Sequence, residues 1–542
     1  MTDFLPDVED KHEPVVLHED DPRIPEDFDG DIELNSATKW IYGQPKDQVT
    51  DAEVQALMHE VAEYIGDICE KTMKPVPHIR VSTEVEAVNG LNKAKFPHSN
   101  SLNRNSSAGL PYSWHTTKGK RDILDWNEDK NVWVIADNEL GNALKTDICN
   151  LTRNCRNLRK TGTVFYGRLK DEVKKLKHIY GVPKTRSFAA GPLHLNILWR
   201  KYFGQAVELL NNLAGAEGSP FTNGMDPHSE AWHTMILDML RVGAKGMDKD
   251  SPDWDAHILN VYMRNCWIVY DDLYKRFGRW SEKDSIIRRG IYKHMAEPLI
   301  TMKGFVVQCN GGPSGKNGTR SDNDIVNFVQ ELRMWKKFVT VMKGMNDMRA
   351  SMLLEAMKRD PVPTGVLRRL HPTVYSYMEF VAPKFGGDDY VATVSPDIET
   401  WYNFNTMREI ATRVFDLEVT DAQKSEDGYT LRPLEELEFL KRVPVKMGGI
   451  WRGKCVPSTM DKTLNWGHCH TKRYPWECRN GDIIVTDTYD SDVNGICTES
   501  ALWGPEFYGR MQKHLAHCFE SIGSAIAIPS YEETCSKFWA PL

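Results

Sequence analysis

The stretch YSYMEFVAPKFGGDDYVATVS, residues 375–395, joins two runs of apolar and aromatic residues through the turn Gly-Gly-Asp-Asp at residues 386–389. β-Branched and aromatic residues favour strands, and glycines permit a tight turn, so the stretch predicts a β-hairpin with strands over 375–385 and 390–395. Two adjacent carboxylates at its tip repel each other unless a cation lies between them. The hairpin therefore predicts a metal site, although Asp and Gly are also ordinary residues of surface turns.

A second acidic segment, GMDKDSPDWDAH at residues 246–257, lies upstream and places Asp250 five residues before Asp255. The pattern predicts that Asp250 ends a strand and that Asp255 lies just past the following turn. A chain leaving a strand in this way can offer one carboxylate to a metal ion and the next to a ligand in the same cleft. A lone calcium loop is the alternative, but the Gly and the bidentate Glu of an EF-hand are missing.

The third segment, NGGPSGKNGTRSDNDIVNFVQEL at residues 310–332, is a glycine-rich loop that leads into a predicted helix. Thr319 and Asn323, four residues apart, project from one side of the first turns of this helix. A phosphate-binding loop is the alternative, but its spacing is one residue short and Asn317 stands where Ser or Thr binds magnesium. The apolar residues at helical spacing predict a buried face: Ile325, Phe328, Val329, Leu332 and Trp335.

In this order, the three segments resemble motifs A, B and C of viral RNA-dependent RNA polymerases. Four more segments follow the family order. Upstream, NSSAGLPY (105–112), followed by KGKRDIL, resembles motif G, and LKDEVKKLKHIYGVPKTRSF (169–188) resembles motif F. Downstream, VTDAQKS (419–425) resembles the end of motif D, and FLKR (439–442) resembles motif E. The SAGLPY, KDE and FLKR details are similar to the picornavirus-like branch, and the resemblance covers roughly residues 100–445. It implies an α+β fold, a right-hand polymerase of fingers, palm and thumb with an antiparallel palm sheet and encircling fingertips.

The motif positions imply how the chain is divided. The expected parts are an acidic N-terminal arm over 1–35, fingers over 36–235 and 262–310, a palm over 236–261 and 311–442, and a thumb over 443–542. A thumb of this size is small, which in the family goes with an open channel and primed initiation, often from a protein primer. The resemblance therefore implies an RNA template and primer, NTPs, a protein primer and other viral replication proteins as partners.

The resemblance assigns the metal role to Asp250, Asp388 and Asp389, which are expected to be catalytic. Two magnesium ions can hold the attacking 3′ oxygen and the leaving pyrophosphate oxygens, and carboxylates from separate strands can hold both ions. Mg²⁺ is therefore the expected cofactor, as two ions, and Mn²⁺ can substitute because both prefer carboxylate and water oxygens.

Asp255 and Asn323 match the pair that reads the ribose in this family, with Ser314 and Thr319 in support. A 2′ hydroxyl both donates and accepts, so a carboxylate and an amide together can satisfy it. A deoxyribonucleotide would leave both groups unpaired, at a cost of about 1 to 3 kcal/mol for a buried group. The alternative for Asn323 is local bonding to its own helix backbone.

Positive side chains are expected around the triphosphate. The segment 168–186 carries a local charge of +5, which is also typical of a solvated helix face. The resemblance assigns Lys170, Lys184 and Arg186 to the phosphates, and Lys424 to protonation of the departing pyrophosphate. An exposed loop lysine is the alternative for Lys424. The remaining expected positions contact the template or primer, mostly at the backbone: Ser107, Gly109, Pro111, Gly315, Phe439, Leu440, Lys441 and Arg442.

The composition fits a large soluble enzyme. The net charge of −8 looks unfavourable for an RNA binder, but the first 35 residues carry −11, so the remainder carries about +3. The prolines and few large apolar residues of that arm suggest an extended or partly disordered segment, which either lies along a basic surface of the molecule or keeps the protein soluble. No signal peptide precedes the chain and no apolar run approaches about 20 residues, so we expect no transmembrane segment.

Eleven scattered cysteines without a framework spacing indicate a reduced protein of the host cell cytoplasm, in viral replication complexes or associated with virus particles. A C-terminal cluster is a candidate zinc site, although no CxxC pair supports it and ordinary packing is the alternative. Its members are His468, Cys469, His470, Cys478, His514, His517 and Cys518.

Two features depart from the family pattern. Gly386 replaces the Tyr that normally precedes Gly-Asp-Asp, which is expected to loosen the hairpin while leaving the metal ligands in place. Asn323 and Asp388 are 65 residues apart, more than usual, and the segment 342–372 resembles an extra helix and loop.

Three rival functions remain to be weighed. Reverse transcriptases share the palm, but they block the 2′ hydroxyl where this chain carries Asp255 and Asn323. Diguanylate cyclases share Gly-Gly-Asp, but the following Glu-Phe is missing. An inactive RNA-binding scaffold has no use for a desolvated carboxylate cluster.

Overall fold

The computed structural model describes residues 11–28, 30–42, 47–180, 182–344, 362–424, 429–465, 476–479, 482–485, 487–521 and 527–539. The central feature is a four-stranded antiparallel sheet in the spatial order β10-β11-β7-β12. Its strands are β7 (Lys245–Lys249), β10 (Val381–Gly386), β11 (Asp389–Val394) and β12 (Arg432–Pro433). The predicted hairpin is thus formed, with Gly387 and Asp388 at its tip.

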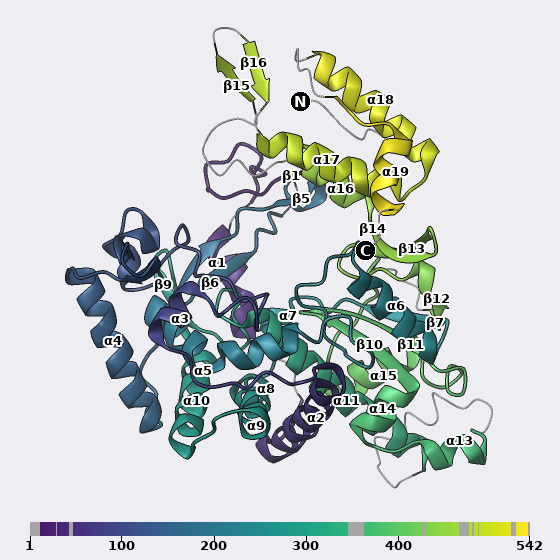
Figure 1. Cartoon of the computed structure of the whole chain (residues 1–542), viewed down its shortest axis with the longest axis horizontal. Helices are drawn as coiled ribbons and strands as arrows, with labels where there is room; N and C mark the ends of the chain where they lie inside the picture. The colour runs from purple at the N-terminus through teal and green to yellow at the C-terminus, as the bar shows by residue number, and fades with distance from the viewer. Residues whose placement is uncertain are drawn as a thin grey trace.

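Alternate residues of the sheet face two different hydrophobic clusters, as the period of a strand requires. Val391 packs with helix α6 (Glu230–Val242), whereas its neighbours Tyr390 and Ala392 belong to the main core with helix α11 (Thr319–Met342). Both faces of the sheet are therefore covered, which fixes its register. In Figure 1, α6 is labelled above β10 and β11 and α11 below them, and both helices contact the hairpin.

Only part of the first predicted strand is a strand. Residues from Val374 to Phe380 form helix α14, and β10 begins at Val381. The hydroxyl of Thr373 accepts the backbone N–H of Ser376 and caps the helix. Val374, Tyr377 and Phe380, three residues apart, turn one face into the core. The helical spacing of these residues and the Thr373 cap outweigh the preference of valine and aromatic residues for strands.

Helix α11 is buried on almost every side. The five apolar residues predicted for its inner face, Ile325, Phe328, Val329, Leu332 and Trp335, are all fully buried. Polar residues on its other sides, among them Asp324 and Asn327, are also fully buried. Because buried polar groups need partners, this helix must bond to its surroundings along its length.

A second sheet, in the order β6-β4-β8-β9, lies on the other side of the molecule, with helices packed around it (Figure 1). Strands β4 and β8 are parallel and the other pairs are antiparallel. Its strands are β4 (Val164–Leu169), β6 (Ser187–Ala190), β8 (Leu299–Met302) and β9 (Phe305–Gln308). The helices of this half are α1 (Ile32–Tyr42), α2 (Asp51–Thr72), α3 (Glu84–Asn89), α4 (Glu139–Arg156), α5 (Leu193–Asn211), α7 (Trp254–His257), α8 (Asn260–Asn265), α9 (Trp267–Phe277) and α10 (Glu282–Met295), and a small hairpin joins β2 (Leu124–Asn127) and β3 (Val132–Ile135).

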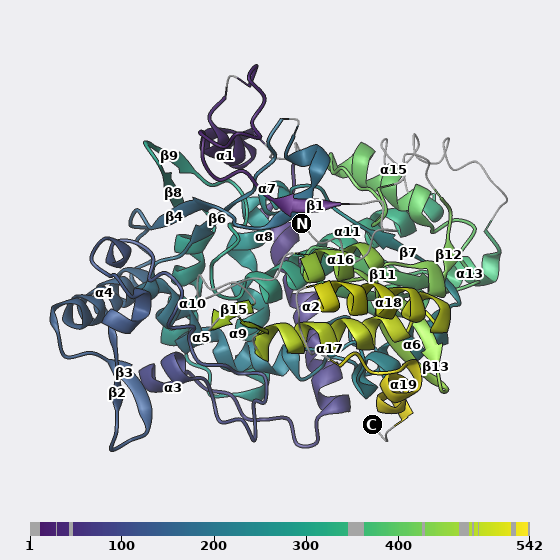
Figure 2. The ribbon, with the colours of Figure 1, turned by 90° about the horizontal axis from the view of Figure 1, so that it is seen from above.

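The C-terminal part forms a separate hydrophobic cluster, gathered at the top of Figure 1. Seen from above in Figure 2, α17 and α18 run side by side. This part comprises the hairpins β13 (Arg442–Met447) with β14 (Ile450–Cys455) and β15 (Trp476–Arg479) with β16 (Asp482–Val485), and the helices α16 (Pro457–Asn465), α17 (Asp487–Ala501), α18 (Pro505–Ser521) and α19 (Tyr531–Trp539).

The described part of the acidic N-terminal arm lies along a basic segment. Strand β1 (His12–Pro14) pairs with β5 (Val173–Lys175), which lies within the predicted motif F. Glu13 accepts hydrogen bonds from Tyr180 and Arg23. Of the two alternatives for the arm, packing on a basic surface of the same molecule is therefore realised for these residues.

Two other expectations concern the suspected insertion and membrane-spanning segments. Within the suspected insertion at 342–372, residues 345–361 lie outside the described part, and the rest includes the short helix α13 (Thr364–Arg369). Helix α15 (Phe404–Phe415) follows the sheet. Among the described helices, none has the length and apolar character that a membrane span requires.

Candidate active site

The register of the central sheet brings the aspartates of two motifs to one edge. Tyr390 pairs with Lys249 across β11 and β7. Asp250 is the next residue after Lys249, so it lies level with Asp389, which directly precedes Tyr390. The predicted strand end at Asp250 is confirmed, and Asp255 falls within the short helix α7 that follows.

Helix α11 holds the Gly-Gly-Asp-Asp turn. The carboxylate of Asp324 accepts the backbone N–H of Gly387 at 2.6 Å and the side-chain amide of Asn223 at 2.6 Å. The amide of Asn327 donates to the carbonyls of Gly387 and Asp388 at 3.4 and 3.5 Å. Desolvation raises the pKa of Asp324 to about 7. Sequence reasoning missed Asp324 and Asn327, although polar residues inside a strongly apolar helix were a usable signal.

The carboxylates at the tip of the turn are poorly compensated by the protein alone. Asp388 is exposed, but the surrounding protein removes part of its hydration, and this desolvation together with the charge of Asp250 raises its pKa. Desolvation and the charge of Asp388 raise the pKa of Asp389 to about 7, against the opposing effect of Lys441. A divalent cation would relieve this repulsion.

The donor set fits magnesium or manganese, because it consists of carboxylate oxygens, and Asp388 is exposed to solvent. Asp250, Asp388 and Asp389 would hold the ions. Over the part of the chain that the structure describes, no three His, Cys, Asp or Glu side chains already form a closed set of ligands.

Lys424 lies at the same edge of the sheet. Its Nζ is 3.1 Å from Oδ2 of Asp250, and its side chain is 68% exposed. The loop that carries it is tied to the strand end by a pair of backbone hydrogen bonds between Asp250 and Thr420, at 2.8 and 3.1 Å. The loop position is therefore fixed, while the side chain retains the freedom to leave the carboxylate.

The residues predicted to read the ribose lie on two elements, Asp255 on α7 and Asn323 on α11. Gly312 donates its N–H to the carbonyl of Asp255 at 2.8 Å, and a β-carbon on Gly311 would lie 2.1 Å from the same oxygen. The glycines of the loop thus allow it to pack directly against α7. On α11, Asn323 is 9% exposed, and its side-chain oxygen is buried without a hydrogen-bond partner. A hydroxyl donor from a ligand would satisfy that oxygen.

The two supporting residues bond to the backbone of their surroundings. The hydroxyl of Thr319 donates to the carbonyl of Lys316 at 2.7 Å. The carbonyl of Ser314 accepts the N–H of Ala189 in β6 at 3.1 Å, and a β-carbon on Gly315 would lie 2.4 Å from the carbonyl of Ala189. Gly315, expected to contact the template or primer, is therefore also needed for the loop to approach the strand.

The carboxylate of Asp255 has a partner that sequence reasoning missed. Lys39 of helix α1 donates to its two oxygens at 2.9 and 2.8 Å. The two residues are 216 positions apart, and nothing in the local sequence around Lys39 signals the contact.

The three cations predicted for the triphosphate, Lys170, Lys184 and Arg186, are all exposed and lie in the segment between β4 and β6. Arg186 bonds through Nε and Nη2 to the buried Glu172, and Nζ of Lys170 lies 3.4 Å from that carboxylate. Burial alone would raise the pKa of Glu172, but Arg186 and neighbouring lysines outweigh it and lower the pKa to about 2. The charges of Asp255 and Asp388 contribute to the raised pKa of Arg186, behind the larger effect of its hydrogen bond to Glu172. Glu172 is thus an ionised anchor for the cations.

The predicted motif G packs against the start of α5. The N–H of Gly109 donates to the hydroxyl of Ser107 at 3.1 Å. Gly109 has φ +66°, and a β-carbon there would lie 2.5 Å from the carbonyl of Gly191. Ser107 and Pro111 are exposed, whereas Gly109 is buried and serves the packing of the loop.

The four residues of motif E divide between structure and surface. Phe439 is buried beside Trp232 of α6, with ring centroids 6.5 Å apart. Arg442 bonds through both terminal nitrogens to Glu499 of α17, at 2.9 and 2.7 Å. The side chain of Lys441 is 59% exposed, and Leu440 precedes it at the turn. Only Leu440 and Lys441 therefore remain available to a nucleic acid in this arrangement.

The candidate zinc cluster lies largely outside the described residues. Nothing is described of His468, Cys469 and His470 or of the side chain of Cys478. The helix α18 carries His514, His517 and Cys518, and within the described ranges these form no metal-binding group of three with other ligands.

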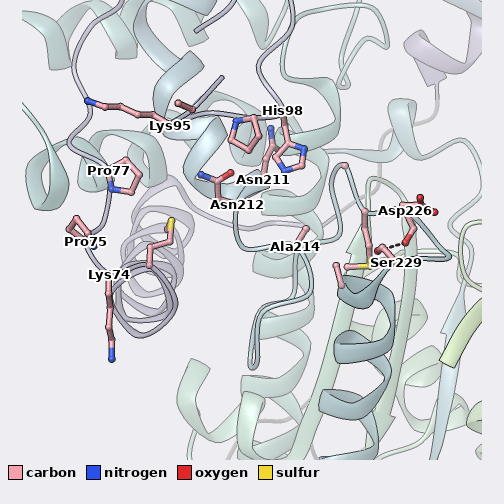
Figure 3. A pocket seen from close by; sticks show the side chains of 16 residues that line it. Lys74, Pro75, Pro77, Lys95, His98, Asn211, Asn212, Ala214, Asp226 and Ser229 are labelled. Carbon is pink, nitrogen blue, oxygen red and sulfur yellow. Dashed lines mark hydrogen bonds between the residues drawn. The ribbon is translucent and has the colours of Figure 1, made fainter. Parts of the chain in front are cut away.

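A cavity of about 630 Å³ lies away from the aspartates. Figure 3 shows it between the loop with Lys95 and His98 and the end of α5 with Asn211 and Asn212, close to the hydrogen-bonded Asp226 and Ser229. None of the residues predicted for metal, nucleotide or RNA lines it. It is therefore not the active site.

Comparison with known proteins agrees with the family that the sequence resembles. The sequence model of a family described as viral RNA-dependent RNA polymerase matches residues 4–519. The replicase polyprotein of Drosophila C virus is 24% identical over 406 residues, which cover 73% of this chain and 21% of the relative. The genome polyprotein of human hepatitis A virus is 23% identical over 449 residues, covering 82% and 17%. The chain thus spans about a fifth of the length of these polyproteins.

A solved structure shares the fold. The Sicinivirus 3Dpol RNA dependent RNA polymerase superposes with a TM-score of 0.68 at 18% identity, covering 98% of this chain and 92% of the other. This similarity extends over nearly the whole length of both chains. The expected right-hand architecture is therefore present.

Proposed function

The chain belongs to the family of viral RNA-dependent RNA polymerases, and we propose that it extends an RNA primer along an RNA template by nucleotidyl transfer from NTPs. The observation that carries this proposal is the sheet register that aligns Asp250 with Asp389, next to Asp388 at the tip of the turn. Carboxylates from two strands at one edge are the arrangement that two-metal phosphoryl transfer requires.

In the proposed reaction, the primer 3′ oxygen attacks the α-phosphorus of the NTP, a new P–O bond forms, and the bond to the β-phosphate oxygen breaks. Two Mg²⁺ ions, with Mn²⁺ able to substitute, would lower the pKa of the 3′ hydroxyl and stabilise the charge on both oxygens. Asp250, Asp388 and Asp389 would hold these ions. Lys170, Lys184 and Arg186 would orient the triphosphate, and Lys424 would give a proton to the departing pyrophosphate.

Selection of ribonucleotides would rest on α7 and α11. Asp255 would accept the single proton of the 2′ hydroxyl, and the side-chain amide of Asn323 would donate to the hydroxyl oxygen. Ser314 and Thr319 would keep the loop in place. A reverse transcriptase would instead fill this space with a bulky side chain, so the pair favours RNA synthesis.

We assign residues 236–261 and 311–442 to the palm, 36–235 and 262–310 to the fingers, 443–542 to the thumb and 1–35 to the arm. The template and primer would contact Ser107, Pro111, Leu440 and Lys441, with Gly109, Gly315, Phe439 and Arg442 shaping the loops that carry them. The small C-terminal part favours primed initiation, with a protein primer and other viral replication proteins as partners. We expect the enzyme in replication complexes of the host cytoplasm or with virus particles.

The test is extension of a labelled RNA primer on an RNA template with NTPs and Mg²⁺, for the wild type and Asp388→Asn. We expect templated extension that falls by at least about 100-fold in the variant, because a metal ligand is lost. Asp397→Asn, at an exposed aspartate outside the site, is the matched control and should extend normally. No extension by the wild type with either Mg²⁺ or Mn²⁺ would overturn the proposal and favour a scaffold role.

A further inference from the structure

Outside the seven motifs, one cation enters the predicted ribose site. Lys39 of α1 donates two hydrogen bonds to Asp255, one to each oxygen, at 2.9 and 2.8 Å. The side chains of Lys39 and Asp255 are 16% and 18% exposed. Such a shielded, two-point ion pair is held more firmly than a surface salt bridge, because water competes less for both groups.

The helix that carries Lys39 is itself fixed by the elements around the site. Ser187 of β6 donates its hydroxyl to the carbonyl of Ser36 at 3.0 Å, and Asn310 donates its N–H to the carbonyl of Trp40 at 3.3 Å. The side chain of Trp40 is fully buried. Helix α1 thus touches the strand of motif F, the start of the motif B loop and α7 of motif A. The position of the Lys39 ammonium is therefore set by the same segments that build the nucleotide site.

The charge around Asp255 explains why a cation is needed there. The field of Asp255 acts on Asp388, where it contributes to the raised pKa of that carboxyl after desolvation and the charge of Asp250. Without Lys39, the Asp255 carboxylate would be repelled by Asp388 with no partner to fix its rotamer. Lys39 occupies two of about four acceptor positions of the carboxylate. The others remain for the 2′ hydroxyl.

We propose that Lys39 is a positioning residue for ribose selection, which holds the Asp255 carboxylate in the orientation that accepts the 2′ hydroxyl. The proposal rests on the proposed function, since it concerns the same nucleotide site. It adds a specificity determinant from the N-terminal helix, remote in sequence from every motif that contacts the NTP.

The test compares ATP and 2′-dATP in single-nucleotide primer extension by the wild type, Lys39→Met and Lys39→Arg. Methionine keeps the length of the side chain and removes its charge. We expect Lys39→Met to lower the ratio of kcat/KM for ATP to that for 2′-dATP by about tenfold, mainly through a higher KM for ATP, because a hydrogen bond to a charged group is lost. Lys39→Arg should restore most of the ratio. Leu34→Ala, at an exposed position of the same helix, should leave it unchanged.

A double-mutant cycle separates positioning from general damage. In the background of Asp255→Asn, the substitution Lys39→Met should change the ratio by less than about twofold, because its only route of action is removed. Equal losses for ATP and 2′-dATP, or an unchanged ratio, would overturn the inference while wild-type extension still supports the proposed function. If Lys39→Met yields no folded protein by thermal melting, the neutral variant Lys39→Gln takes its place, and an unchanged ratio in Lys39→Gln would again overturn the inference.

Discussion

Gly386 occupies a position with almost no room for a side chain. A β-carbon there would lie 2.7 Å from Cδ2 of Leu440 and 3.1 Å from Cζ of Phe439. The residue before Gly-Asp-Asp therefore touches the turn of motif E, and the Tyr usual in the family does not fit against this turn. Asp324 and Asn327 hold the following turn through Gly387, so the glycine at position 386 leaves the backbone that carries Asp388 in place.

Gly386→Ala should destabilise the protein by about 1 kcal/mol through overpacking. The nearest atom belongs to the end of a flexible side chain, so Leu440→Ala should relieve the clash. Thermal melting of both single variants and the double variant measures the coupling. We expect the double variant to be more stable than the sum of the single effects by about 1 kcal/mol. Additive effects would show that Leu440 does not limit the space at Gly386.

Site residues could be predicted where the residues that act together lie close to one another along the sequence. Asp250, Asp255, Asn323 and Asp388 stand in short segments whose spacing carries the signal, and the structure brings Asp250 and Asp388 to one edge. Lys39, in contrast, has its partner 216 residues away, and its own surroundings read as an ordinary helix. Long-range ion pairs of this kind leave no local pattern.

At the scale of elements, periodicity predicted α11 correctly and the segment 375–380 wrongly. In α11 the apolar spacing was unambiguous, and every predicted inner residue is buried. Before the hairpin, the residues are of types that favour strands, but the buried ones recur every three residues, which also suits one face of a helix. The Thr373 cap then favours the helix. The sequence prediction did not consider the helix cap at Thr373. Because of this cap the strand begins at Val381 and not at Tyr375, while the turn stays where it was predicted.

Helix α5 carries a buried acid that makes stability depend on pH. Glu208 is 6% exposed; one of its oxygens accepts from Asn211 at 3.1 Å, and the other is buried without a partner. Desolvation raises its pKa to about 7. Between about pH 4.5 and 7 the folded protein binds a proton that the unfolded chain has released. Stability is therefore lost as the pH rises through this window, by up to about 3 kcal/mol.

Glu208→Gln should remove that loss, because the amide is neutral at every pH in the window. We expect the variant to melt about 2 to 5 °C above the wild type at pH 8 and close to it at pH 5. Glu139→Gln, at an exposed position of α4, is the control and should show no such trend. A constant difference between pH 5 and pH 8 would contradict the ionisation argument.

At the scale of the whole molecule, the C-terminal part is tied to the rest from two sides. On one side, Lys11 of the arm lies 3.7 Å from Asp461 of α16, and the neighbouring strand β1 pairs with β5. On the other side, Glu499 of α17 accepts from Arg442 and from His228, which lies just before α6. Apolar packing joins the parts as well, because Trp451 of β14 lies in the same cluster as Trp232 of α6, whereas helices α16 to α19 belong to a separate cluster.

The Glu499 contact is the stronger candidate for holding the C-terminal part in place. Its carboxylate accepts Nη1 and Nη2 of Arg442 at 2.9 and 2.7 Å, Nε2 of His228 at 3.0 Å and the N–H of Cys455 at 3.2 Å. Burial alone would raise the pKa of Glu499, but the hydrogen bonds from His228 and Arg442 lower it to about 2. The carboxylate is therefore ionised at every working pH, and three segments depend on one charge.

Glu499→Gln should loosen the C-terminal part without touching the chemistry at the aspartates. The amide keeps the shape but leaves the shielded Arg442 guanidinium without its counter-charge, at a cost of about 2 kcal/mol. We expect the lifetime of the complex with primer and template to shorten several-fold in a salt challenge, with the rate of the first nucleotide addition unchanged. Glu506→Gln, in an exposed pair with Arg510 of α18, should keep the wild-type lifetime, because surface pairs contribute little. A slower first addition with a normal lifetime would instead mean that Glu499 acts on the active site through motif E and not on the grip of the molecule on RNA.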